Sequence, residues 1–253
     1  IQVIHLPYFG LNNNIIKRSE MRNSLLYIIL MLVMMFISSC KNDSTEGLTF
    51  ITHYPTLTLE GESFMVVEKG TTFYEPGYLA ILHDEDVTNQ VEVISEVNMN
   101  QSGLYSIFYK ITNVEGFAKI ASRQVLVVDF NDTIEGAYYT TVDSYCNIDG
   151  DIISYDSNYL LYILANGDGT YTINDMLGGY YEQGAGYGSD YAMVGVFTID
   201  EDGIITGLGG DVVGWGDSMD YLEDGVYDAT TGTISWKLGY AGMEFYVIMN
   251  KWN

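Results

Sequence analysis

The chain carries many short apolar segments separated by turn residues, and this pattern continues from about residue 54 to the end. The segments are rich in β-branched and aromatic residues, and several alternate with the period of two that strands require. In residues 104–112, for example, the side chains of Tyr105, Ile107 and Tyr109 fall on one face. No segment repeats its apolar residues at the helical spacing. We therefore predict an all-β protein.

The first group of these segments predicts one small domain. Its clearest strands are expected at residues 63–67, 91–97, 104–112 and 118–128. Glycine and asparagine mark the turns between them. Strands that recur every 8–12 residues or so, without a helix between them, favour two packed sheets. We place this sandwich at residues 54–130, ending in the polar stretch 129–133.

The second group predicts a larger domain at residues 131–253. Its strands are expected at residues 137–145, 159–165, 169–175, 191–200, 203–207, 225–227, 233–238 and 243–250. Asn166-Gly167 and Asp202-Gly203 are strong hairpin signals, because these residue types tolerate a positive φ. Successive hairpins predict an antiparallel meander, either an up-and-down barrel or a two-sheet sandwich.

A different pattern precedes these domains. Residues 25–37 are apolar without interruption and follow Met21 and Arg22. A helix of that length spans about 20 Å, which is short of the roughly 30 Å hydrocarbon core of a bilayer. A positively charged start, a short apolar core and small residues behind it are typical of a secretory signal rather than a membrane helix. We expect the signal at residues 21–39, with residues 1–20 as an upstream extension or fragment.

Small residues and a cysteine end this segment as Ile37-Ser38-Ser39-Cys40, which resembles the lipobox of bacterial lipoproteins. The polar stretch that follows is similar to the tether of Bacteroidetes surface lipoproteins. The resemblance implies cleavage before Cys40, lipidation of Cys40, and a tether at residues 40–53. It also implies an outer-membrane protein that is exposed at the cell surface and held by its lipid anchor alone. Several acyl chains on one cysteine hold a protein stably at a membrane, since each buried CH₂ contributes about 0.8 kcal/mol to the free energy of membrane binding.

Charge and composition exclude several classes of function. The 10 basic and 34 acidic residues give a net charge of −24. Such an excess argues against a nucleic-acid partner, because phosphates are bound by clustered Lys and Arg. His5, His53 and His83 are scattered, so we expect no histidine metal centre, no histidine-based catalysis and no cofactor. The cysteine other than Cys40 is Cys146, which we expect to be a buried small apolar residue.

Acidic residues gather in turns of the second domain, for example at Asp149-Gly150-Asp151 and Asp200-Glu201-Asp202. Calcium binds oxygen ligands of this kind, but none of the turns contains a complete EF-hand pattern. We expect solvated hairpin turns and no metal site. The 19 acidic residues of residues 133–253 also make chance carboxylate pairs certain, so pairing alone does not indicate a glycoside hydrolase.

Several motifs of the first domain resemble the bacterial surface immunoglobulin-like domain. They are Tyr74-Glu75-Pro76-Gly77, Asp86-Val87-Thr88, Gly103-Leu104-Tyr105, Tyr109 to Gly116, and Arg123-Gln124-Val125-Leu126-Val127. Asn113 stands where that family often has Asp, which changes one turn residue. The resemblance covers about residues 54–129 and implies an immunoglobulin-like sandwich that serves as a spacer or interaction module without catalytic residues.

The second domain resembles the C-terminal domains of Bacteroidetes lipoproteins that accompany starch-utilisation-system-like outer-membrane importers. The similar stretches are residues 169–181, 184–188, 215–217 and 227–235. The resemblance implies a surface lipoprotein of a nutrient-uptake complex, with a TonB-dependent importer and its binding lipoprotein as partners. The implied cargo is an extracellular glycan or oligopeptide. The resemblance assigns no ligand-binding residues.

Glycine and tyrosine alternate closely in residues 178–188, which makes this stretch the strongest candidate for ligand binding. Glycine lets the backbone approach a partner, and tyrosine rings offer flat amphipathic contact surfaces. We expect Tyr180, Tyr181 and Tyr187 to bind ligand together with Trp215, which lies between two glycines. The alternative is that these rings cap one end of the sheet or pack beneath a loop.

Three classes of function follow from these features. A non-catalytic accessory component that binds cargo is favoured by the lipobox, the β domains and the aromatic stretch. A structural or assembly subunit of the same complex, without ligand affinity of its own, is the alternative. A hydrolase is least favoured, because the chain lacks a Ser/His/Asp set and a Gly-x-Ser-x-Gly elbow.

Overall fold

The computed structural model describes residues 51–252. The chain divides into two compact units, Ile1–Thr52 and His53–Asn253, and all described strands belong to the second. Cys40, the expected signal at 21–39, the extension at 1–20 and most of the 40–53 tether lie outside the described residues. Within residues 51–252, no helix is long and apolar enough to cross a bilayer.

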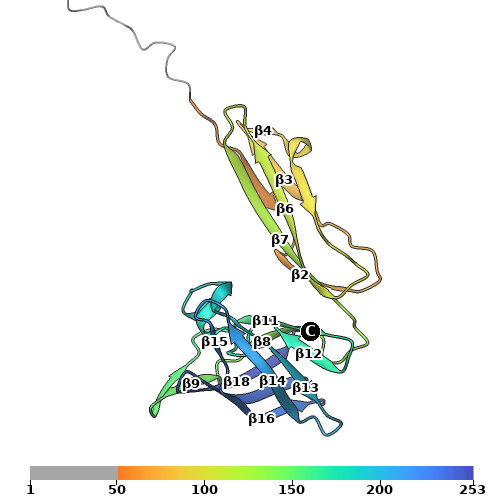
Figure 1. The fold of residues 1–253 in the computed structure, drawn as a ribbon. Helices are drawn as coiled ribbons and strands as arrows, with labels where there is room; N and C mark the ends of the chain where they lie inside the picture. The colour runs from red at the N-terminus through yellow and green to blue at the C-terminus, as the bar shows by residue number, and fades with distance from the viewer. Residues whose placement is uncertain (1–50, 253) are drawn as a thin grey trace, which may run out of the picture. The chain divides into compact units, whose positions relative to one another are not determined.

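The first part of the described chain forms two small sheets (Figure 1). One contains β1 (Thr56–Leu59), β3 (Tyr78–Leu82) and β4 (Glu85–Asp86). The other has the order β2 (Phe64–Glu68), β7 (Ala118–Val128), β6 (Gly103–Thr112) and β5 (Glu92–Ser95). Strand β2 runs parallel to β7, and the other pairs are antiparallel. The four strands predicted here are confirmed. The pattern misses β1, β3 and β4, which contain four, five and two residues.

Arg123 on β7 explains why two of the sequence motifs occur together. Its side chain is fully buried, and its Nη2 lies 3.0 Å from Oε1 of Glu75 in the turn before β3. The guanidinium also donates hydrogen bonds to the carbonyls of Glu60, at 2.7 Å, and Glu62. A buried charge is tolerated when it is paired and hydrogen-bonded. The motif that contains Glu75 and the motif that contains Arg123 therefore stabilise the same turn.

The second part of the described chain forms one large antiparallel sheet. Its strands are β8 (Gly136–Thr140), β9 (Tyr145–Ile148), β10 (Asp151–Ser154), β11 (Leu160–Ala165), β12 (Thr170–Ile173), β13 (Met193–Ile199), β14 (Ile205–Val212), β15 (Asp217–Ser218), β16 (Tyr221–Asp228), β17 (Thr233–Tyr240) and β18 (Met243–Lys251). The order is β10-β9-β18-β8-β11-β12-β13-β14-β15, with β17 pairing β18 and β16 pairing β17. Strand β16 meets the chain before β14 through one isolated bridge, Ile204 to Val226. The all-β class and the antiparallel sheet are confirmed. The sheet departs from a simple meander where β18 lies between β8 and β9, and among the described residues it does not close into a barrel.

The expected hairpins are confirmed, and one expected strand is wrong. Turns at residues 166–169, 200–203 and 230–232 connect β11 to β12, β13 to β14 and β16 to β17. The segment 137–145, expected as one strand, breaks after Thr140. There the Ser144 N–H donates to the Thr141 carbonyl at 3.1 Å, and the Ser144 hydroxyl donates to the Ile248 carbonyl at 3.2 Å. These bonds replace ladder pairing, so the chain turns before β9.

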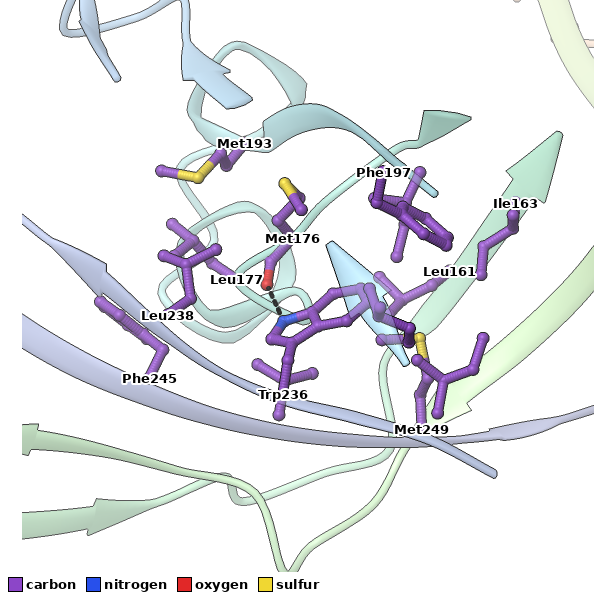
Figure 2. Packing of buried hydrophobic residues seen from close by; sticks show 14 of the residues in the cluster. Leu161, Ile163, Met176, Leu177, Met193, Phe197, Trp236, Leu238, Phe245 and Met249 are labelled. Carbon is purple, nitrogen blue, oxygen red and sulfur yellow. Dashed lines mark hydrogen bonds between the residues drawn. The ribbon is translucent and has the colours of Figure 1, made fainter. Parts of the chain in front are cut away.

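Trp236 on β17 lies in the core of the large sheet, and Figure 2 shows its neighbours Leu161, Phe197 and Met249. The indole Nε1–H donates to the Met176 carbonyl at 3.0 Å (Figure 2), which satisfies the polar atom of a fully buried ring. Cys146 is also fully buried, as expected. Burial raises the pKa of its thiol to about 11, so the thiol stays protonated and unreactive at neutral pH.

Candidate functional site

The candidate aromatic residues follow a buried turn at residues 175–179, which we name the anchor loop. The Asp175 carboxylate accepts hydrogen bonds from the backbone N–H groups of Leu177 at 2.9 Å and of Gly179 and Met193 at 3.0 Å each. Burial raises the pKa of Asp175 to about 7, although these three donors act in the opposite direction. One side chain thus organises both ends of the segment that contains the tyrosines.

Side chains from other elements satisfy the carbonyl groups of the anchor loop. Trp236 bonds the Met176 carbonyl, the Tyr155 hydroxyl donates to the Leu177 carbonyl at 2.5 Å, and the Thr140 hydroxyl donates to the Gly178 carbonyl at 2.8 Å. Buried backbone groups need such partners. The anchor loop is therefore fixed by the core.

Gly179 ends the anchor loop in a conformation that only glycine adopts easily. Its φ is +85°, and a Cβ there would lie 2.5 Å from Cβ of Tyr159. A one-turn π-helix, Tyr180–Gly184, begins directly after it. Because the preceding backbone is fixed, the core sets the direction in which Tyr180 and Tyr181 leave the anchor loop.

The four predicted residues occupy different depths. Tyr180 packs inward, with its ring 5.4 Å from that of Tyr155 and 5.3 Å from that of Phe245. Tyr181 is half-buried and contacts both the core and the surface rings. Tyr187 and Trp215 are 56% and 42% exposed, so these two present the accessible ring surface.

Three of the predicted residues and one that the sequence pattern missed form a surface group, which we name the aromatic cluster: Tyr181, Tyr187, Tyr191 and Trp215. The Trp215 ring centroid lies 4.8 Å from those of Tyr181 and Tyr191 and 6.1 Å from that of Tyr187. Three members, Tyr187, Tyr191 and Trp215, line a shallow hollow of about 480 Å³. The sequence thus brings Trp215 to the tyrosine stretch as predicted, and their role in ligand binding stays a prediction.

A backbone hydrogen bond joins the two segments that carry the aromatic cluster. Trp215 lies in the turn between β14 and β15, and Gly214 beside it donates its N–H to the Asp190 carbonyl at 2.6 Å. A Cβ at Gly214 would come within 2.8 Å of the Tyr191 ring, so glycine permits the close approach. The sequence offers one signal that Tyr191 belongs to the aromatic cluster, namely its position three residues after Gly188.

Carboxylates flank the aromatic cluster. Asp190 precedes Tyr191, and the exposed Asp217 follows Trp215 by two residues. Burial raises the pKa of Tyr240, and the negative charges of Asp217 and Asp220 raise it further. The two carboxylates therefore lie near the Tyr240 ring. The Tyr240 ring centroid lies 6.4 Å from that of Trp215. The hollow therefore lies in a region of negative potential.

The acidic turns show the contacts of ordinary hairpins. The Asp200 carboxylate accepts the N–H groups of Asp202 at 3.0 Å and of Ile204 at 2.8 Å. Asp168 and Asp228 accept N–H groups two residues later in the same way. Among residues 51–252, no group of three or more His, Cys, Asp or Glu side chains is arranged to hold a metal ion.

Two family models match the described chain in succession. One is described as a bacterial surface protein, Ig-like domain, and matches residues 57–127. The other describes a C-terminal domain and matches residues 128–251. No curated protein matches the chain.

Among solved structures, the lipoprotein BT2262 from Bacteroides thetaiotaomicron is 39% identical with a TM-score of 0.71. The similarity covers 79% of this chain and 100% of that one. Two further matches come from Clostridium perfringens ZmpB. The M60 catalytic domain with its CBM51-1 and CBM51-2 domains is 13% identical over 49% of this chain and 15% of that one, with a TM-score of 0.27. CBM51-2 in complex with GlcNAc and INT domains is 16% identical over 47% of this chain and 31% of that one, with a TM-score of 0.26. Similarity at that level carries no argument about fold or ligand.

Proposed function

This chain belongs to the family of the lipoprotein BT2262 from Bacteroides thetaiotaomicron, and on that basis we propose that it is a non-catalytic surface lipoprotein that binds extracellular cargo. The cargo, a glycan or an oligopeptide, is passed to a TonB-dependent outer-membrane importer and its binding lipoprotein. Cys40 carries the lipid anchor, and in the sequence the immunoglobulin-like domain lies between Cys40 and the binding domain.

The aromatic cluster is the observation that carries this proposal. It exposes two large rings, Tyr187 and Trp215, on a shallow hollow. Backbone hydrogen bonds hold the segments that carry them, from the Tyr187 N–H to the Tyr181 carbonyl at 3.1 Å and from the Gly214 N–H to the Asp190 carbonyl at 2.6 Å. Rigid aromatic side chains bind with little loss of conformational entropy, and such rings often dominate binding energy. A preorganised hollow of this kind favours recognition of a ligand over a purely structural role.

The proposal assigns no catalytic residue. Asp175 is the carboxylate with the most strongly raised pKa near the cluster, but it is fully buried and its oxygens accept backbone N–H groups. It is therefore inaccessible to a substrate. Cys146 is likewise buried and protonated.

Glycan and peptide arrays probed with the chain from residue 41 onward test the proposal. We expect a bound class whose affinity falls about tenfold or more in Tyr187→Ala and in Trp215→Ala, since hot-spot truncations cost about 2 kcal/mol or more. Tyr74→Ala is the matched control, because it removes a ring that is 80% exposed in the other domain. If no array ligand binds the parent chain while the importer complex still assembles on it, the assembly-subunit alternative is correct.

A further inference from the structure

The aromatic cluster has a geometry that suits a slender group better than a flat ring. The rings of Tyr187 and Trp215 are inclined at 88° to each other, those of Tyr191 and Trp215 at 62°, and those of Tyr187 and Tyr191 at 69°. Three mutually inclined rings form a corner rather than a platform. A pyranose stacks against one flat face, whereas an extended aliphatic side chain entering the corner touches several rings at once.

Within residues 133–253, the charged side chains beside this corner are carboxylates. Asp190, Asp217 and Asp220 are exposed beside it, and the faces of Tyr and Trp rings are themselves negative. Residues 133–253 contain two basic side chains, and both have partners of their own. Lys237 lies 3.3 Å from the Glu223 carboxylate and 3.4 Å from that of Glu244. The Lys251 ammonium donates to the Thr133 carbonyl at 2.8 Å.

We infer that the hollow formed by Tyr187, Tyr191 and Trp215 recognises a cationic side chain, the ammonium of lysine or the guanidinium of arginine, on an extended basic oligopeptide. This inference rests on the proposed function and narrows its cargo. A cation over a tryptophan or tyrosine face is attracted by the ring quadrupole, most strongly when it is partly desolvated. The surrounding carboxylates raise the local concentration of cationic ligands and speed their association. The aliphatic part of the side chain fills the corner between the rings.

Calorimetry with capped tetralysine and tetraarginine tests the inference, with capped tetraglutamine as the neutral match of equal length. We expect the basic peptides to bind and tetraglutamine not to bind. Trp215→Ala and Tyr187→Ala should each weaken binding about tenfold or more. Asp217→Asn should weaken it about threefold. Asp202→Asn is the matched charge control, because Asp202 lies in the turn before β14 and Trp215 in the turn after it. It should leave affinity unchanged, and circular dichroism of each variant should match the parent.

Several results would overturn the inference, and they separate it from the proposed function. Equal affinity of tetralysine for the parent and Trp215→Ala would mean diffuse attraction to an acidic surface. If a neutral glycan or tetraglutamine binds and the binding depends on the rings, the proposed function is supported, but the hollow does not require a cationic group. If a fully deacetylated glucosamine tetramer binds and the basic peptides do not, the hollow recognises a cationic group, but its ligand is a glycan and not a peptide. Absence of binding by every probe and array ligand would overturn both proposals.

Discussion

Replacing Asp175 by asparagine tests whether one buried carboxyl group controls how stability depends on pH. Burial raises the pKa of Asp175 to about 7 in the folded protein, and unfolding returns it to near 3.8. Between these values the folded state holds a proton that the unfolded state has released. The free energy of unfolding therefore falls as pH rises through this window. A difference of about three pKa units corresponds to roughly 4 kcal/mol.

The asparagine variant should lose this pH dependence, and its free energy of unfolding should be lowered by an amount that does not depend on pH. Its Oδ1 can keep the N–H donors of Leu177 and Met193, but its Nδ2 amide then faces the N–H of Gly179. Leaving one buried donor without an acceptor costs about 1–3 kcal/mol at every pH. We expect Asp175→Asn to be less stable than the parent near pH 4.5 and more stable near pH 8, so the two stability curves cross.

Urea unfolding followed by circular dichroism between pH 4.5 and pH 8 measures this difference directly. Comparing parent and variant cancels the titrating groups that do not interact with Asp175. Glu182, whose carboxylate helps to raise the pKa of Asp175, contributes to the measured difference. Asp202→Asn is the control, because Asp202 is an exposed residue of a hairpin turn and should shift neither curve. Parallel curves for the parent and Asp175→Asn would refute the reasoning, since they would mean that Asp175 titrates alike in the folded and unfolded states.

Three further predictions address the anchor, the core and the domain boundary. Cys40→Ala should abolish incorporation of a fatty-acid probe during growth, and label that persists would exclude lipidation at this residue. Trp236→Phe should lower the free energy of unfolding by about 1–3 kcal/mol, because the buried Met176 carbonyl loses its donor; an unchanged urea midpoint would contradict this. A fragment of residues 129–253 should melt cooperatively with a β-type spectrum, since it retains Asp132, whose carboxylate accepts the N–H groups of Ile134 and Glu135. Disorder of this fragment beside a folded full chain would show that the domains depend on each other.

The sequence by itself determined the strands and most of the turns. Apolar and β-branched residues predicted β6 and β7 nearly to the residue. Burial alternates with a period of two in residues 107–112 and 121–125, whereas residues 125–128 are buried on both faces of the strand. Asp-Gly and Asn-Gly pairs predicted the turns at 166–169 and 200–203, because positive φ is a local property of those residues. The sequence also predicted that Tyr187 and Trp215 belong together, from their shared glycine-rich surroundings.

Tertiary structure alone decided which of the aromatic residues reach the surface. Tyr180 and Tyr181 are neighbours in the sequence and are both half-buried against Phe245. Tyr180 also packs against Tyr155, whereas Tyr181 contacts the exposed Trp215. The orientation depends on hydrogen bonds to the anchor loop from Tyr155 and Trp236, which are distant in the chain. Composition and spacing carry no information about such long-range partners. A tyrosine next to a glycine can be core or surface, and the direction of the preceding backbone, fixed here by Asp175, settles which it becomes.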